Sequence, residues 1–387
     1  MSELRWVTAG ESHGRALAGI LEGLPAGLAL DLARVDAELA RRQGGHGRSG
    51  RMRIEQDRIE LLSGTRGGVT LGSPLAFTLV NQDHTIERLP VPTNPRPGHA
   101  DLAGCQKYGH RDPRAVLERA SARETAARVA LGALARQLLE AFEVELFAHV
   151  VELGGLAARA DAFEVAGERR AELRARSDFY ALDPEVEAPW RARVDAARAA
   201  GDTLGGVFEV RVIGLPPGLG SYANPSERLG ARLAGALLSI PAMKGVEFGL
   251  GFECARRPGS EVHDALVPPA QAPSSASARW GRFARATNRA GGLEGGLTTG
   301  EALVARVAMK PIPSLRAALP SLEFGSGAEV AASYQRSDVT SVPAASVVGE
   351  AVVALELTRA FLAKFGGDAL DEVRASFAAW RARVAEL

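Results

Sequence analysis

The sequence predicts an α+β fold in which strands and helices form packed layers within one large domain, residues 1–387. Strand-like and helix-like segments alternate without the regular spacing of βαβ units, which disfavours a doubly wound parallel sheet. Hydrophobic residues make up 46% of the 387 residues, enough to bury a sizeable core. Although this length permits two or three domains, large single α+β folds also reach it, and no internal repeat divides the chain.

Short apolar runs bounded by glycine or proline turns predict the strands. The first run, Leu17–Leu21, ends at a turn over residues 22–27, EGLPAG. We expect further strands near Leu71–Val80, Glu145–Val151, Val207–Ile213 and Ala302–Met309.

Apolar residues at helical spacing predict a helix over Val116–Phe142, and Ser121 with Glu124 fits a capping box. A second helix is expected over 344–365 and a terminal one over about 368–387. The terminal helix buries one apolar face, formed by Val373, Phe377, Trp380 and Val384. Residues 160–200 are rich in Ala, Arg and Glu, and we expect a variable, exposed helix or loop.

The charge balance argues against a general nucleic-acid binder, because Lys+Arg and Asp+Glu both total 46. Any anion site must therefore be local. The two cysteines, Cys105 and Cys254, lack metal-type spacing, so neither a disulfide framework nor a metal site is expected. Neither a membrane-spanning apolar stretch nor a signal peptide is recognisable, so we expect a cytoplasmic protein that does not bind membranes.

Residues 10–14, GESHG, match the G-x-S-x-G nucleophile elbow of serine hydrolases. That elbow is a strand-turn-helix unit, whereas a strand is predicted after this motif. The hydrolase interpretation, with Ser12 as nucleophile, is therefore kept only as an alternative.

Residues 41–53 hold five arginines and His46 among glycines. The segment contains a literal G-x-G-x-x-G at 45–50, but a helix-like run precedes it instead of the strand that a dinucleotide fingerprint requires. What remains is a flexible cationic loop, either solvated or clamping an anionic substrate. A second alternative function is thus an arginine-rich polyanion-binding protein.

Other candidate residues lie in loops and at helix ends. His99, in a Pro/Gly loop, can act as an acid or base or simply decorate the surface. Arg119–Thr125, at a predicted helix start, is an anion site or a capped helix with a surface ion pair. The turn at 288–296 lets a ligand approach the backbone, Lys310–Ser314 leaves an apolar strand, and Asp338 is an ion-pair partner or a reacting carboxylate.

Three segments together resemble the signatures of the chorismate synthase family. They are residues 10–27, residues 118–129 (ERASARETAARV) and residues 336–352. The linking pieces PGHADL, KGVEFG, NRAGGLEGG and KPIPS occur in the family's order, and the likeness spans about residues 4–365.

This resemblance implies a lyase that makes chorismate from 5-enolpyruvylshikimate 3-phosphate by anti-1,4-elimination of phosphate, the last step of the shikimate pathway. It also implies reduced FMN without net redox change, a β-α-β-α sandwich and a homotetramer. It leaves open whether NADPH reduces the flavin on this protein or a separate flavin reductase supplies it.

The resemblance further implies three catalytic residues. His13 matches the histidine that protonates reduced flavin or sets its ionisation, and His99 the one that protonates the leaving phosphate. Asp338 matches the carboxylate that acts with flavin N5 when the C6 proton is removed. Substrate contacts are expected from Arg42, Arg48 and Arg123.

Cofactor contacts carry over to a larger set. Arg42 and Arg48 match NADPH positions. The flavin positions are Arg119, Ala120, Ser121, Pro241, Ala242, Gly295, Lys310, Pro311, Ile312, Pro313, Ser314 and Arg336. Pro241 stands where many members have a polar residue, so only its backbone is expected to contact the flavin.

Overall fold

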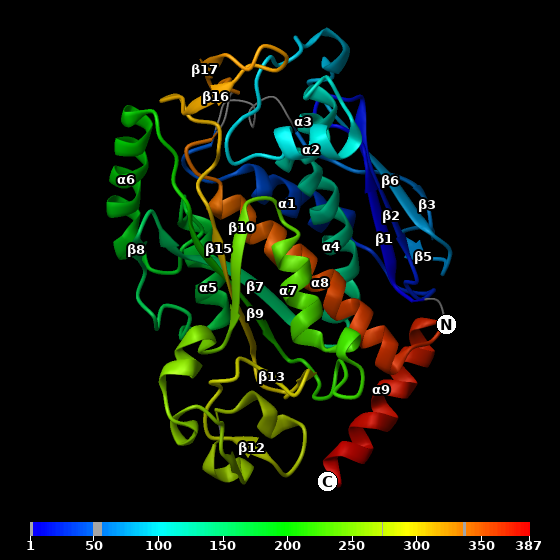
Figure 1. Cartoon of the computed structure of the whole chain (residues 1–387). Coiled ribbons are helices and arrows are strands. Elements are labelled where there is room, and N and C mark those ends of the chain that lie inside the picture. The colour runs from blue at the N-terminus through cyan, green and yellow to red at the C-terminus, as the bar shows by residue number, and fades with distance from the viewer. Residues whose placement is uncertain (1–2, 49–55, 273, 336–337) are drawn as a thin grey trace.

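Two antiparallel sheets enclose a layer of helices in the computed structural model, which describes residues 3–48, 56–272, 274–335 and 338–387 (Figure 1). The first sheet has the order β1-β2-β6-β3, with strands Arg5–Ala9, Ala16–Glu22, Leu75–Val80 and Glu60–Ser63. The second has the order β10-β15-β9-β7-β8, with strands Met243–Phe248, Leu303–Met309, Gly206–Ile213, Glu145–Leu153 and Leu156–Ala157.

The first sheet is half-buried, as its alternating sequence requires. In β2, Leu17 and Leu21 are buried while Ile20 is exposed, and in β6 Leu75 and Phe77 follow the same alternation. The buried face packs on helices α1 (Leu32–Gln43) and α4 (Thr125–Glu140). The expected strand near 71–80 begins only at Leu75, because Gly72 and Pro74 form a turn before it.

Helix α8 (Val342–Phe365) is the centre of the core and is buried around most of its circumference. It packs on α1, α4, α7 (Leu229–Leu238) and the second sheet. Gly132 allows the closest approach of α4 to α8, since a Cβ there would lie 2.5 Å from the Cα of Ala351. The expected helix over 344–365 is confirmed.

The second sheet is covered on both faces. Phe208 and Val210 point to α8, while Phe147 and Arg211 point outward to Phe163. Helices α5 (Gly167–Arg176) and α6 (Glu187–Ala200) belong to this outer layer, beyond the sheet on the left of Figure 1. The layers therefore follow the order β-α-β-α, which confirms the expected α+β sandwich.

Residues 160–200 are helical as expected, but they are exposed only in part. Phe163, Phe179 and Trp190 are buried, because this segment covers the outward face of the second sheet. Because alanine, arginine and glutamate dominate this segment, its composition gave no signal for the few apolar side chains that anchor it.

The single helix expected over Val116–Phe142 is wrong. The segment forms α3 (Arg114–Ala120), a 3-10 turn over Ala122–Glu124 and α4. The backbone of Ser121 is extended, and its Oγ accepts a hydrogen bond from the backbone N–H of Arg123 at 3.3 Å. Ser121 thus caps a new helical start, as the predicted capping box requires of it. The other residue of that box, Glu124, binds the side chains of Thr8 and Arg128 and does not complete the box.

The terminal helix α9 (Leu370–Ala385) buries Val373 and Trp380 as expected. The main hydrophobic core contains residues from Leu4 to Trp380. Four two-stranded pairs complete the described strands: β4 Thr65–Arg66 with β5 Val69–Thr70, β11 Leu266–Val267 with β12 Ala284–Arg285, β13 Leu293–Glu294 with β14 Leu297–Thr298, and β16 Pro320–Leu322 with β17 Glu329–Ala331.

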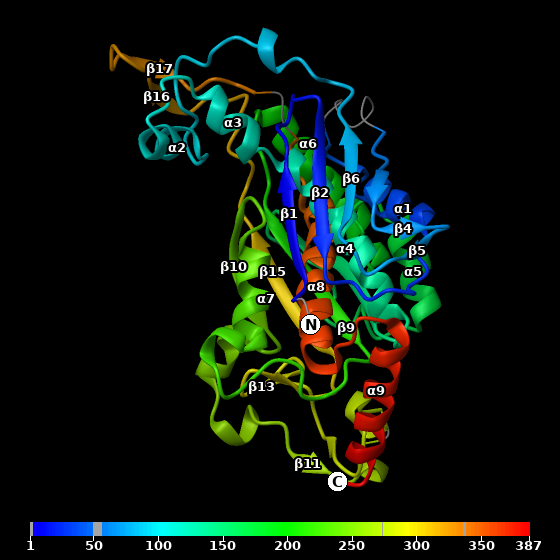
Figure 2. The same cartoon turned by 90° about the vertical axis from the view of Figure 1, so that its right-hand side faces the viewer.

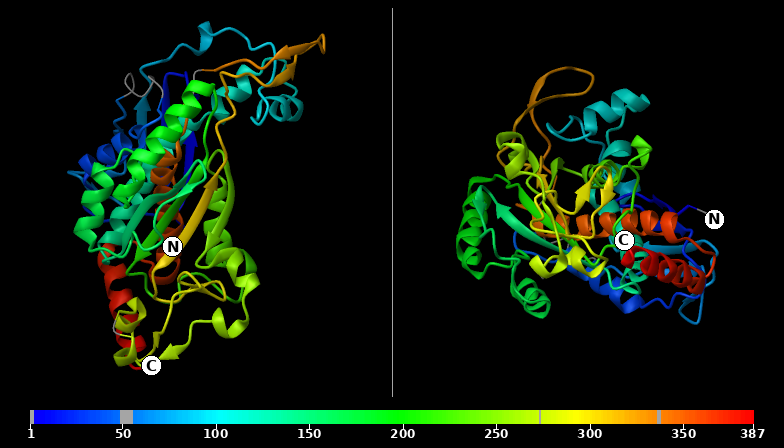
Figure 3. Two further views of the ribbon diagram at one scale, coloured as in Figure 1. Left: turned by 90° about the vertical axis from the view of Figure 1, so that its left-hand side faces the viewer. Right: turned by 90° about the horizontal axis from the view of Figure 1, so that it is seen from below.

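Among the helices described, none combines the length and the apolarity needed to cross a bilayer. Helix α2 (Asp101–Tyr108), α3 and the β16-β17 pair gather at one end of the sandwich, at the top of Figure 2, with the C-terminus at the other end. The end-on view in Figure 3 shows α8, in orange, running through the middle of the molecule.

Candidate active site

Residues 10–14 connect the antiparallel strands β1 and β2 and do not enter a helix. The strand-turn-helix geometry of a nucleophile elbow is therefore missing, as the sequence predicted. Ser12 is buried, and its hydroxyl accepts a hydrogen bond from that of Ser121 at 3.1 Å. The motif serves to bring its serine and histidine against helix α3.

His13 is fixed by the buried carboxylate of Glu118 on α3. Its backbone N–H donates to Glu118 at 2.8 Å, and its Nδ1 lies 3.0 Å from both carboxylate oxygens. Its Nε2 lies 3.8 Å from Asp83. Burial alone would raise the pKa of Glu118, but the hydrogen bonds from His13 lower it below its usual value.

His99 has a similar arrangement at the start of α2. Its Nδ1 lies 2.7 Å from Asp101, which also accepts two hydrogen bonds from the Arg96 guanidinium at 2.8 and 3.0 Å. Burial opposes the charge of Asp101, yet the hydrogen bonds from His99 and Arg96 bring its pKa well below the usual range. His99 is therefore an ordered loop residue and not surface decoration.

Two of the expected substrate-binding arginines meet on one buried carboxylate. Arg123 contacts both oxygens of Asp57 at 2.7 Å, and Arg42 contacts the same carboxylate at 2.9 Å. Asn81 accepts a further bond from Arg123 at 2.9 Å. Burial lowers the pKa of Arg42 to about 10, so the guanidinium stays protonated at neutral pH.

The cationic segment 41–53 is only partly a loop. Arg41 and Arg42 belong to the last turn of α1, and Arg41 pairs with Glu38 and Glu350. A helix, not a strand, precedes the literal G-x-G-x-x-G, which supports discarding it as a dinucleotide fingerprint. With Arg41 and Arg42 both paired, a free polyanion-binding strip is not supported; Arg51 and Arg53 lie outside the described residues.

Arg48 and Asp338 form an ion pair of 2.6 Å. The structure thus joins an expected substrate-binding cation to an expected catalytic carboxylate, two residues separated by most of the chain. Arg336, predicted to contact the flavin, lies outside the described residues.

The predicted flavin tripeptide Arg119–Ser121 lies where α3 ends. Ser121 reaches Ser12, and the Arg119 guanidinium donates to the carbonyls of Thr8 and Gly10 at 3.0 and 3.1 Å. The tripeptide is thereby attached to the loop that carries His13.

The segment Lys310–Ser314 connects several of the other predicted residues. The backbone N–H of Lys310 donates to Ala242 at 3.0 Å, and its ammonium donates to the carbonyl of Gly98, beside His99. Ser314 accepts a bond from the backbone of Gln335 at 3.1 Å. Partial burial and the nearby Lys244 lower the pKa of Lys310. Pro241 precedes Ala242 in the same turn, so both lie at this end of the second sheet.

Gly295 is not brought to the other predicted flavin residues. It lies in the β13-β14 pair before β15, whereas Lys310 follows β15. Seven residues of strand separate these two ends by about 20 Å. Within one chain, Gly295 therefore lies at the opposite end of the second sheet.

Sequence reasoning missed Asp57, Asn81, Glu118 and Asp101, which bind the predicted residues directly. Asp101 sits two residues after His99, and Glu118 begins the second signature, so both could have been suspected from proximity in the sequence. Asp57 offers no comparable signal, because its contacts with Arg42 and Arg123 form only in the folded chain.

Known proteins resemble this chain in both sequence and structure. A sequence model of the chorismate synthase family matches residues 4–362. A chorismate synthase of Trichlorobacter lovleyi is 52% identical over 384 residues, which cover 96% of this chain and 97% of that protein. One of Geobacter metallireducens is 50% identical over 387 residues, 97% of each chain. A crystal structure of chorismate synthase is similar with a TM-score of 0.81 and 39% identity over the whole of both chains.

Proposed function

The chain belongs to the chorismate synthase family of shikimate-pathway lyases, and we propose that it converts 5-enolpyruvylshikimate 3-phosphate to chorismate and phosphate with reduced FMN. The observation that carries the proposal is that each expected proton-transfer group has its own charged partner: His13 pairs with Glu118, His99 with Asp101, and Asp338 with Arg48. No single motif makes this combination.

The local cations suit a substrate with one phosphate and two carboxylates. The Arg48 side chain is 10% exposed and its guanidinium pairs with Asp338, so a substrate anion would compete with that carboxylate. Arg123 and Arg42 lie deeper, and Asp57 holds their positions. The chain's zero net charge is compatible with this load because the arginines are concentrated locally.

The donors expected to hold FMN fit that group chemically. Arg119 and Lys310 supply cationic donors, and Ser121 supplies a hydroxyl. A flavin phosphate and a polar ring edge are bound by such donors. When bound, reduced FMN supplies the electron density that eases loss of phosphate.

Side chains of the protein then assist the cleavage of two bonds in the substrate. The C3–O bond breaks with its electron pair on phosphate, and the C6–H bond breaks as the new ring diene forms. His99 protonates the departing phosphate, and Asp338 assists removal of the C6 proton. His13 protonates the reduced flavin or sets its ionisation. It acts through Nε2, because its Nδ1 is hydrogen-bonded to Glu118.

Phosphate release under anaerobic conditions tests the function. With photoreduced FMN, the protein should release phosphate from 5-enolpyruvylshikimate 3-phosphate in equal amount to chorismate. The same assay with oxidised FMN and NADPH alone asks whether this chain reduces its own flavin. Absence of phosphate release with photoreduced FMN would overturn the proposal, whereas turnover with NADPH alone would instead assign the reductase activity to this chain.

A further inference from the structure

The two histidines of the site share one feature: a buried carboxylate on the same ring nitrogen. Nδ1 of His13 lies 3.0 Å from Glu118, and Nδ1 of His99 lies 2.7 Å from Asp101. The carboxylate side chains are 1% and 2% exposed. An ionised carboxylate only accepts hydrogen bonds, so a bond from Nδ1 to it needs a proton on that nitrogen. At His99 the guanidinium of Arg96, also a donor only, lies 3.0 Å from the same nitrogen, farther than Asp101 at 2.7 Å.

Each carboxylate is also held from behind. Asp101 accepts the backbone N–H of Arg96 at 3.1 Å in addition to its guanidinium. Glu118 accepts the backbone N–H of His13 and lies 3.4 Å from the guanidinium of Arg114, which is itself anchored on the carbonyl of Pro90. These partners fix the orientation of the two carboxylates, and the carboxylates in turn fix the orientation of the histidine rings.

The histidine rings remain accessible although their partners are buried. The side chains of His13 and His99 are 19% and 18% exposed. Around His13, the charged groups are Glu118, Asp83 at 3.8 Å from Nε2, and Arg114 behind Glu118.

Around His99, the charged groups are Asp101, Arg96 at 3.0 Å from Nδ1, and Lys310, which binds the preceding carbonyl.

One helical pair supplies both carboxylates. Asp101 begins α2, and Glu118 lies in α3. The helices touch where Gly104 meets Val116, and a Cβ at Gly104 would lie 2.4 Å from the Val116 side chain. The α2-α3 pair therefore sets the orientation of two proton-transfer groups from one rigid unit.

We propose that Glu118 and Asp101 are positioning residues, which hold His13 and His99 respectively with Nδ1 protonated and Nε2 available for proton transfer. The proposal deepens the proposed function and rests on it for the role of the histidines. Such a carboxylate orients the ring, selects the tautomer and stabilises the imidazolium that forms during transfer.

Reaction with diethyl pyrocarbonate tests the pairing, since the reagent modifies only the unprotonated imidazole. The pH dependence of modification is measured for each histidine by peptide mass spectrometry, without flavin or substrate. In Glu118→Gln, the midpoint for His13 should fall to lower pH while that for His99 stays in place. Asp101→Asn should move only His99. Glu118→Asp and Asp101→Glu keep the charge and should recover part of each shift.

Glu209→Gln is the matched control. It removes a buried carboxylate 3.3 Å from His149, on the outward face of the second sheet, and should leave both midpoints unchanged. The proposal is overturned if either midpoint stays fixed in its own variant, or if each variant moves both histidines equally.

Turnover gives the second readout. The alkaline limb of the kcat–pH profile should move to lower pH in Glu118→Gln and Asp101→Asn and return towards wild type in the charge-conserving variants. Unchanged profiles in all four variants would overturn a positioning role. If the histidines are modified with the expected pH dependence but the unmodified wild-type enzyme shows no turnover, the proposed function fails while the pairing stands.

Discussion

At the scale of single residues, opposite charges hold the predicted catalytic and substrate-binding residues in place. Asp57 joins Arg42 to Arg123, Glu118 orients His13, and Asp101 binds both His99 and Arg96. A buried charge is tolerated only when paired, so each predicted cation or histidine requires a partner nearby. These partners determine where the reactive groups point.

Replacing His99 or Asp338 should greatly slow turnover without abolishing flavin binding. In His99→Ala and Asp338→Ala the proton-transfer groups are lost, while Arg119, Ser121 and Lys310 remain. Fluorescence titration with FMN should therefore resemble wild type, and anaerobic phosphate release should fall by about 10²-fold or more. Loss of flavin binding in either variant would instead make that residue part of the cofactor site.

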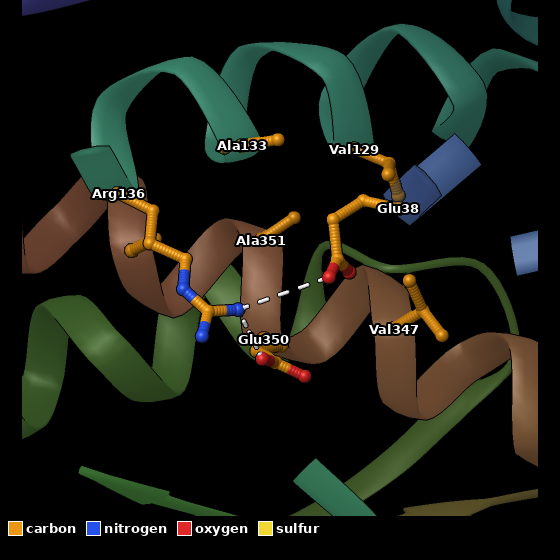
Figure 4. Close-up of a pocket in the computed structure, with 9 residues that line it drawn as sticks. Glu38, Val129, Ala133, Arg136, Val347, Glu350 and Ala351 are labelled. Atoms are coloured by element: carbon orange, nitrogen blue, oxygen red, sulfur yellow. Dashed lines mark hydrogen bonds and ion pairs between the residues drawn. The ribbon is translucent and has the colours of Figure 1, made fainter. Parts of the chain in front are cut away.

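At the scale of elements, the core is organised by close contact of α4 with α8. Gly132 lies over Ala351 at this contact, and the neighbouring side chains of Arg136, Glu38 and Glu350 border a small pocket between the helices (Figure 4). The same helix α4 starts next to Arg123, so its packing affects the position of the site.

Gly132→Ala should destabilise the protein by about 1–3 kcal/mol, because the added methyl group meets the backbone of α8. Urea unfolding at neutral pH measures this change. Gly235→Ala is the matched control: it lies within α7 with open space where a Cβ would lie, and alanine there should be neutral or stabilising. Equal stability of Gly132→Ala and wild type would contradict the close approach of the helices.

At the scale of the whole molecule, Glu350 joins three layers through one buried carboxylate. It binds Arg136 of α4 at 2.5 Å, Arg41 of α1 at 2.8 Å and Arg174 of α5 at 3.4 Å, and accepts the backbone N–H of Ala148 in β7 at 3.3 Å. Burial alone would raise the pKa of Glu350, but the three arginines lower it to about 2.

This depressed pKa makes Glu350 a source of acid sensitivity. Its contribution to the free energy of unfolding is complete above its ordinary value near 4.5 and is lost as the pH falls towards 2. Glu350→Gln should cost about 3–5 kcal/mol at neutral pH by leaving buried arginines uncompensated. It should also flatten the pH dependence of stability between pH 5 and pH 3.

Urea unfolding at a series of pH values checks this expectation. Glu172→Gln is the control, because Glu172 also pairs with two arginines, Arg169 and Arg176, but on the exposed surface. Its stability should stay within about 0.5 kcal/mol of wild type. If Glu350→Gln kept the wild-type slope, another group would have to carry the acid sensitivity.

The sequence by itself determined the local elements and the family. Apolar runs bounded by turns located strands β2, β6, β7, β9 and β15, helical spacing located α8 and α9, and the ordered signatures indicated the chemistry, because these signals depend on neighbours along the chain. The break at Ser121 could not be seen this way, since the extended backbone there is stabilised by Ser12, a partner distant in sequence.

The tertiary structure alone decided which charges meet. Asp57 with Arg42 and Arg123, Arg48 with Asp338, and Glu350 with its arginines are each brought together by packed layers. It also separated Gly295 from the residues that the sequence had grouped with it. Pairing of buried charges depends on distance and desolvation in the folded chain, and neither can be read from residue order.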